Sequence, residues 1–175
     1  MSWAEELSKA MVLLAEHPAT VFIGQSVVYP GHIMFQTLEG VPASKKVELP
    51  VAEDMQAGMS LGLWLSGFIP VSIYPRLDFL IIAANQLTNH LDKWEEMTGQ
   101  APHVIIRSMV GSITPLNPGP QHSQDHTEAL RHLLPHTQIV KLTRPEAVVP
   151  AYWQALEHPA PWVIIEAPPK RRGYE

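Results

Sequence analysis

Residues 49–74 read LPVAEDMQAGMSLGLWLSGFIPVSIY, and this stretch contains the pattern that determines the class of fold, a helix followed by a strand. Its first part predicts a helix over Ala52–Ser66, with Gly67 where glycine commonly ends a helix. The apolar run Ile69–Tyr74 that follows is typical of a strand buried on both faces. A helix followed by a buried strand is the repeating pair of a parallel α/β sheet.

The same alternation of helix and strand extends over the rest of the chain. Further strands are predicted at residues 20–24, 46–49, 103–107, 138–142 and 162–166. Further helices are predicted at residues 3–16, 77–96, 123–134 and 145–157, and an exposed loop at the glycine- and proline-rich residues 29–44. The pattern predicts a three-layer α/β fold, in which a mostly parallel sheet carries helices on both faces. We expect residues 1–175 to form a single domain, with residues 168–175 as a flexible tail.

The composition is that of a globular protein, with 46% hydrophobic and 17% charged residues. The formal charge of −5 comes without the clustered basic face that phosphate backbones require, so we expect no nucleic-acid partner. The absence of cysteine excludes disulfides and thiol catalysis. The most apolar stretch, residues 59–74, is too short and too interrupted by glycine and proline to span a bilayer. With no signal-peptide pattern at the N-terminus, we expect a soluble, cytoplasmic protein without a membrane partner.

Glu53 stands at the predicted start of a helix, just after a strand and a proline. An acid in the first turn of a helix complements the positive end of the helix dipole and needs no other purpose. In context, however, the order strand, Pro-Val-Ala-Glu and glycine-spaced helix resembles the pyrimidine-binding domain of thiamine diphosphate enzymes, in the transketolase superfamily. The resemblance is closest to the beta subunits of the 2-oxo-acid dehydrogenases, and the transketolases are more distant.

Other motifs of this family recur in the same order along the chain. Val21–Gly24 resembles the first strand, and Gly67–Val71 resembles the turn from helix to strand after the key glutamate. Asp78 and Phe79, followed by Gln86, resemble the family's Asp-Phe/Tyr and Asp-Gln segment. Residues 121–124, Gln-His-Ser-Gln, are similar to its His-Ser-Gln motif. The resemblance runs from about residue 20 to residue 167.

The resemblance implies a role for three residues. Glu53 would hydrogen-bond N1′ of the pyrimidine and so promote loss of the thiazolium proton, as a positioned carboxylate can in a dry pocket. Phe79 would pack on the face of the pyrimidine, although a phenylalanine in the hydrophobic core would look the same in the sequence. His122 would face the substrate, but it could instead cap a helix or bind a loop carbonyl. We expect no metal site at His122 and His126, because no third cluster of ligands accompanies them.

The resemblance also implies a second chain. In the family, Mg²⁺ on the diphosphate is held by a Gly-Asp-Gly segment, and this sequence has none. We therefore expect a separate diphosphate-binding subunit to hold the Mg²⁺, and we expect the chain to be inactive alone. We also expect this protein to lack the C-terminal domain that follows in beta subunits and transketolases. Family positions that differ here include Gln25, where glutamate is common, and Asn85, where aspartate is usual.

The function implied is that of the pyrimidine-binding subunit of a split enzyme. With thiamine diphosphate it would cleave or form a carbon–carbon bond next to a carbonyl of a small-molecule substrate, like a 2-oxo-acid dehydrogenase or a transketolase. The alternative is a non-catalytic scaffold or regulatory subunit that keeps the fold and binds a partner protein. Gly58 and Gly62 share one face of the helix in residues 52–66. That face would serve self-association, or else tight packing within the domain.

Overall fold

The computed structural model describes residues 2–111 and 117–168, and its centre is a six-stranded sheet with the order β2-β1-β3-β4-β6-β5. All neighbouring strands are parallel. The strands are β1 (Thr20–Gly24), β2 (Lys46–Glu48), β3 (Ile69–Tyr74), β4 (Val104–Met109), β5 (Gln138–Leu142) and β6 (Pro161–Glu166). The predicted α/β class with a parallel sheet is confirmed.

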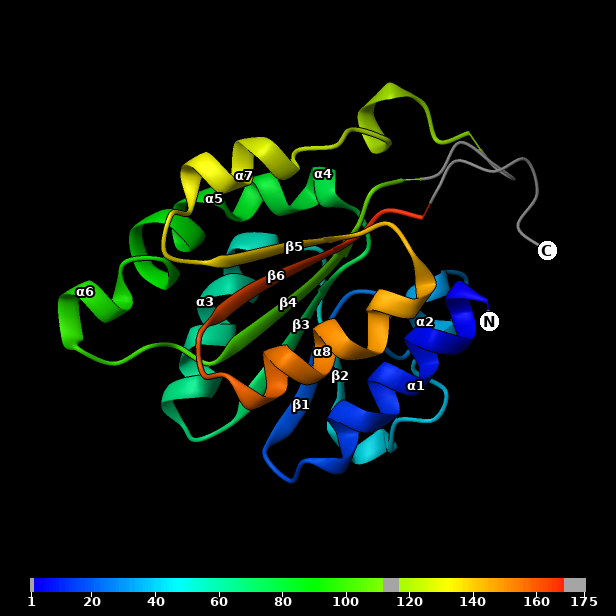
Figure 1. The fold of residues 1–175 in the computed structure, drawn as a ribbon, viewed down its shortest axis with the longest axis horizontal. Helices are drawn as coiled ribbons and strands as arrows, with labels where there is room; N and C mark the ends of the chain where they lie inside the picture. Colours follow the sequence, from blue (N-terminus) through cyan, green and yellow to red (C-terminus); the bar gives the residue numbers. More distant parts are fainter. Residues whose placement is uncertain (1, 112–116, 169–175) are drawn as a thin grey trace.

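Helices cover both faces of the sheet (Figure 1). One face carries α1 (Trp3–Glu16), α2 (Ile33–Gln36) and α8 (Val148–Glu157). The other carries α3 (Glu53–Leu65), α4 (Leu77–Leu80), α5 (Ala84–Gln86), α6 (Trp94–Thr98) and α7 (Thr127–Leu133). Successive side chains of a strand point to opposite faces, so Ile105 joins the core under α1 and α8 while Ile106 joins the core under α3 and α4. The three layers follow from this alternation.

Three predicted segments are wrong in part: residues 29–44, 77–96 and 123–134. Residues 29–44 are not simply an exposed loop, because they contain α2 and because Met34, Leu38 and Val41 are buried in the core. Residues 77–96 do not form one helix: α4, α5 and α6 are separated by a 3₁₀ turn at Ile81–Ala83 and a π turn at Leu87–Leu91. The π turn ends at the buried Asp92, whose Oδ1 accepts hydrogen bonds from His136 N (3.0 Å) and Thr137 Oγ1 (2.8 Å). These tertiary contacts favour the break over a regular helix.

The predicted helix 123–134 begins only at Thr127. Residues 120–122 form a 3₁₀ turn, and the following residues are held by side chains: Asp78 binds Gln124, and Asp125 accepts hydrogen bonds from the N–H and the hydroxyl of Thr127. His122 therefore lies in the connection and not directly before the helix. The predicted tail, apart from Pro168, lies outside the described residues. Among the described residues, no helix has both the length and the apolarity that a membrane span requires.

Candidate active site at the carboxyl ends of the strands

Glu53 is a buried carboxylate at the first residue of α3, only 4% exposed. Gln25 Nε2 donates a hydrogen bond to Glu53 Oε1 at 3.2 Å, and Tyr74 Oη donates to the Glu53 carbonyl oxygen at 3.3 Å. Gln25 follows β1 and Tyr74 ends β3, so the parallel sheet brings both to the edge where ligands bind in open α/β folds. A surface acid that only complements the helix dipole would not be enclosed in this way. The geometry suits a group that exchanges a proton with a ligand.

The segment that carries Gln25 is held by a residue that the sequence analysis did not identify. Both carboxylate oxygens of Glu48 accept hydrogen bonds from main-chain N–H groups, those of Ser26, Val27 and Val28, each at 2.7 Å. Ser26 has φ +58°, a left-handed conformation that is uncommon outside glycine and asparagine. Glu48 thus stabilises a backbone shape that places Gln25 against Glu53. The partners lie 20 or more positions apart in the chain, so no local pattern announces this contact.

A second group of residues forms around His122. Its imidazole contacts the ring of Phe79 edge to face, with ring centroids 5.4 Å apart and planes at 73°. His122 Nδ1 is buried and has no hydrogen-bond partner among the described residues. Both side chains are half-buried, so Phe79 is not enclosed in the core. The structure therefore brings Phe79 and His122 together, beside β3 and β4, while the hydrogen bonds of Glu53 run to Gln25 and Tyr74.

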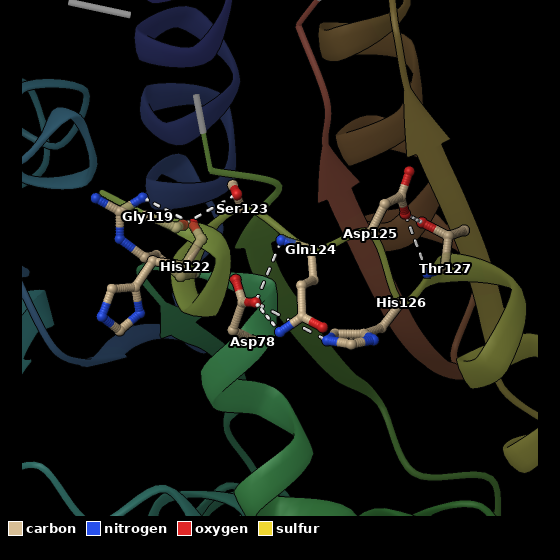
Figure 2. Close-up of polar contacts among 9 residues, drawn as sticks. Asp78, Gly119, His122, Ser123, Gln124, Asp125, His126 and Thr127 are labelled. Atoms are coloured by element: carbon tan, nitrogen blue, oxygen red, sulfur yellow. Dashed lines mark hydrogen bonds and ion pairs between the residues drawn. The ribbon is translucent and has the colours of Figure 1, made fainter. Parts of the chain in front are cut away.

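Asp78, in α4, contacts two residues of the segment that follows His122, Gln124 and His126 (Figure 2). Its Oδ1 accepts from Gln124 N at 3.3 Å and from Gln124 Nε2 at 3.2 Å, and His126 Nε2 lies 3.9 Å from the same oxygen. Asp78 Oδ2 is buried and has no partner among the described residues. His126 thus faces Asp78 and not His122. In residues 2–111 and 117–168, no three acidic or histidine side chains gather in a way that could hold a metal ion.

A buried ion pair lies at the carboxyl ends of β4 and β6. Arg107 Nε donates to Glu166 Oε1 at 2.6 Å, and Tyr152 Oη donates to the same oxygen at 2.8 Å. Burial lowers the pKa of Arg107, but the charges of Glu166 and Tyr152 and the hydrogen bonds to both together outweigh it, so the net shift is upward. Burial, followed by the charge of Glu166, raises the pKa of Tyr152. The sequence analysis missed this group. The available signal was a charged residue near the end of each of two otherwise apolar strands.

His32 lies near the positive charges of Arg76 and Arg107. Burial, followed by the charges of Arg76 and Arg107, lowers the pKa of His32 to about 4. His32 Nδ1 accepts a hydrogen bond from Met34 N at 3.2 Å, at the start of α2. A neutral imidazole at physiological pH is the form that can accept this bond.

Comparison with known proteins gives two kinds of match. No family model matches the chain. Curated relatives from two strains of Mycobacterium tuberculosis, each named 3-methyl-2-oxobutanoate dehydrogenase subunit beta, are 28% identical over 98% of this chain. A solved structure described as a split gene transketolase, inactive beta4 tetramer, matches 95% of the chain with a TM-score of 0.69 and 18% identity, which supports the fold. The chain spans about half the length of these relatives: 50% of the dehydrogenase subunits and 51% of the transketolase chain.

Proposed function

Because this chain is a pyrimidine-binding domain of the kind found in thiamine diphosphate enzymes, we propose that it is the pyrimidine-binding subunit of a split enzyme that cleaves or forms a carbon–carbon bond next to a carbonyl. The observation that carries the proposal is the burial of Glu53 at the start of α3, with a neutral hydrogen-bond donor, Gln25, on its carboxylate. When bound, thiamine diphosphate would supply the thiazolium carbon that attacks the carbonyl.

Glu53 would bind the pyrimidine and control one proton. A buried carboxylate can share a proton with a ring nitrogen across a short, charge-assisted hydrogen bond. Gln25 orients the Glu53 side chain by donating to Oε1, and its amide adds no competing acid. The carboxylate is thus oriented before the ligand arrives, which reduces the cost of binding.

Phe79 and His122 would act on the other parts of the ligands. The half-buried ring of Phe79 offers an apolar surface for a flat heterocycle. His122 Nδ1 lies next to that surface and has no hydrogen-bond partner in residues 2–111 and 117–168, which fits a group that binds or protonates the substrate. The remaining functions, binding of the diphosphate and its Mg²⁺, are assigned in this proposal to a separate subunit. The relatives support this division, since they are themselves named as subunits.

The test is reconstitution with a candidate diphosphate-binding chain, chosen among the products of neighbouring genes by a Gly-Asp-Gly segment and a downstream asparagine. We expect the mixture to bind thiamine diphosphate with Mg²⁺ in calorimetry, and we expect each chain alone to bind weakly and to be inactive. Robust turnover by the single chain with cofactor and Mg²⁺ would contradict the split arrangement. The alternative, a scaffold or regulatory subunit, predicts a stable complex that takes up no cofactor.

His122→Ala in the reconstituted enzyme is expected to lower turnover while leaving exchange of the thiazolium proton nearly unchanged. The imidazole would act on the substrate, after Glu53 has promoted proton loss. If His122 only stabilises its loop, the substitution would cost about 1 kcal/mol of stability, as lost helix caps do, and turnover per folded complex would persist. Proton exchange followed by NMR, turnover and melting temperature are measured on the same variant.

We also propose that the exposed face of α3 is a surface for self-association. Val51 (79% exposed) precedes the helix, Met55 and Met59 lie one turn apart, and Leu65 (55% exposed) is near its end. A Cβ on Gly62 would meet nothing within 4 Å, and one on Gly58 would make only ordinary contact with Gln86 at 3.6 Å. Packing within the domain therefore requires neither glycine. A close approach of another subunit's backbone would explain glycine at position 62.

Gly62→Ala is expected to stabilise the separated chain and to weaken its association. Alanine in a helix interior is favoured over glycine by roughly 0.5–1 kcal/mol, because glycine loses more backbone freedom on folding. The added methyl group would hold the two subunits apart. Sedimentation velocity over a dilution series measures association, and urea unfolding at low concentration measures stability. Gln154→Ala, at an exposed position of α8 on the other face of the sheet, is the control and should leave association unchanged. Association of the Gly62 variant as tight as that of the original chain would exclude this face.

A further inference from the structure

Gly111 lies against the main chain of His122, although 11 positions separate them. A Cβ at position 111 would lie 1.9 Å from the carbonyl oxygen of His122 and 3.0 Å from its carbonyl carbon. It would also lie 2.8 Å from Arg76 Nη1. Atoms of a folded protein do not approach so closely, and a main-chain carbonyl cannot move aside as a flexible side chain can. Any residue other than glycine at this position must therefore displace the backbone of His122.

Arg76 also contacts this carbonyl group. Its Nη1 donates a hydrogen bond to His122 O at 3.3 Å. Arg76 is the residue immediately before α4. Two residues of α4 also contact the loop around His122: Asp78 accepts a hydrogen bond from Gln124, and the ring of Phe79 contacts the imidazole. The loop that carries His122 is thus contacted by residues 76–79 and by Gly111. Arg76 acts on its main chain, and Phe79 acts on its ring.

We propose that Arg76 and Gly111 are positioning residues, which hold the backbone of His122 so that its imidazole stays against the ring of Phe79. This inference rests on the proposed function, in which His122 acts on the substrate. Neither residue needs to touch the substrate. A side chain on an irregular loop gains a defined direction only from such supports, and catalytic groups must be held within about 0.5 Å of the productive position.

The first test uses the isolated chain and needs no cofactor. In the original chain, the ring of Phe79 should shift the NMR signals of the His122 imidazole, which are assigned through their loss in His122→Ala. Gly111→Ala is expected to remove this shift and to speed amide hydrogen exchange at residues 119–124, while signals of the sheet remain. Gln154→Ala is the control, because Gln154 is exposed on α8, which covers the opposite face of the sheet. An unchanged imidazole signal in Gly111→Ala overturns the proposal.

The second test changes Arg76, and it stands even if Gly111→Ala fails to fold. Arg76→Met keeps an apolar stem and removes the donor, so the His122 signals should move; Arg76→Lys can still donate to the carbonyl and should restore them in part. Arg144→Met is the matched control, since Arg144 is 74% exposed and lies elsewhere. Signals that stay in place in Arg76→Met, or that move as far in Arg76→Lys, refute the positioning role of Arg76.

Turnover of the reconstituted enzyme distinguishes the positioning of His122 from its role in the active site. A displacement of about 1 Å can cost on the order of a hundredfold in rate, so Arg76→Met and Gly111→Ala should lower kcat by about 10- to 100-fold with little change in proton exchange at the thiazolium carbon. If His122 moves but turnover is unchanged, the positioning stands and the assignment of His122 to the active site is wrong. If His122 does not move, the positioning itself is wrong, whatever the rate.

Discussion

Glu53→Gln in the reconstituted enzyme is expected to lower turnover by about a hundredfold or more, which is typical for loss of a positioned acid–base group. The amide has nearly the shape of the carboxylate and can still contact Gln25, so folding and assembly should persist. It cannot take up and release the proton, however, so exchange of the thiazolium proton should slow in parallel. Exchange and turnover are measured on the same preparation.

Asp54→Asn is the matched control for this prediction. Asp54 also lies in the first turn of α3, but it is exposed, and its Oδ2 is 3.4 Å from Gln86 Nε2. Both substitutions remove one negative charge from the positive end of the same helix, so both lose the same class of dipole interaction. A small, equal effect of the two changes would mean that Glu53 is only an acid at a helix start.

Glu166→Gln is expected to cause the largest loss of stability, about 3–5 kcal/mol, because it leaves the charge of Arg107 buried without its counterion. Both side chains are almost completely buried, so water cannot replace the lost partner. The amide oxygen can still accept hydrogen bonds from Arg107 and Tyr152, but it cannot neutralise the guanidinium. Urea unfolding measures the change, provided that the slope of the transition is unchanged.

Glu146→Gln is the control for the ion pair. Arg144 and Glu146 approach to 3.7 Å, but their side chains are 74% and 58% exposed, so this change should alter stability by at most about 1 kcal/mol. Replacing Arg107 and Glu166 together by Met and Leu should cost less than Glu166→Gln alone, since no uncompensated charge remains. A double replacement that costs more than the single one would show that the hydrogen bonds, and not the charges, stabilise this part of the core.

Local patterns were sufficient for most of the secondary structure. The strand at residues 69–74 is predicted with its observed bounds, and the one predicted from residue 103 differs by one or two residues. Apolar runs of this length, bounded by glycine or proline, have few other ways to bury their side chains. Gly67 ends α3 with φ +90°, as its position predicts. Failures occur where contacts distant in sequence override the local preference, as at the π turn before Asp92.

By itself, the sequence determined the class of fold, the succession of its strands and the place of Glu53 at a helix start, because each depends on the order and spacing of neighbouring residues. Only the tertiary structure decided that Glu53 is buried against Gln25, that Phe79 contacts His122, and that Arg107 pairs with Glu166. The members of these pairs are separated by 28, 43 and 59 positions. They meet because parallel strands place their carboxyl ends at a common edge, so the order of the strands, and not the local sequence, selects which side chains share a site.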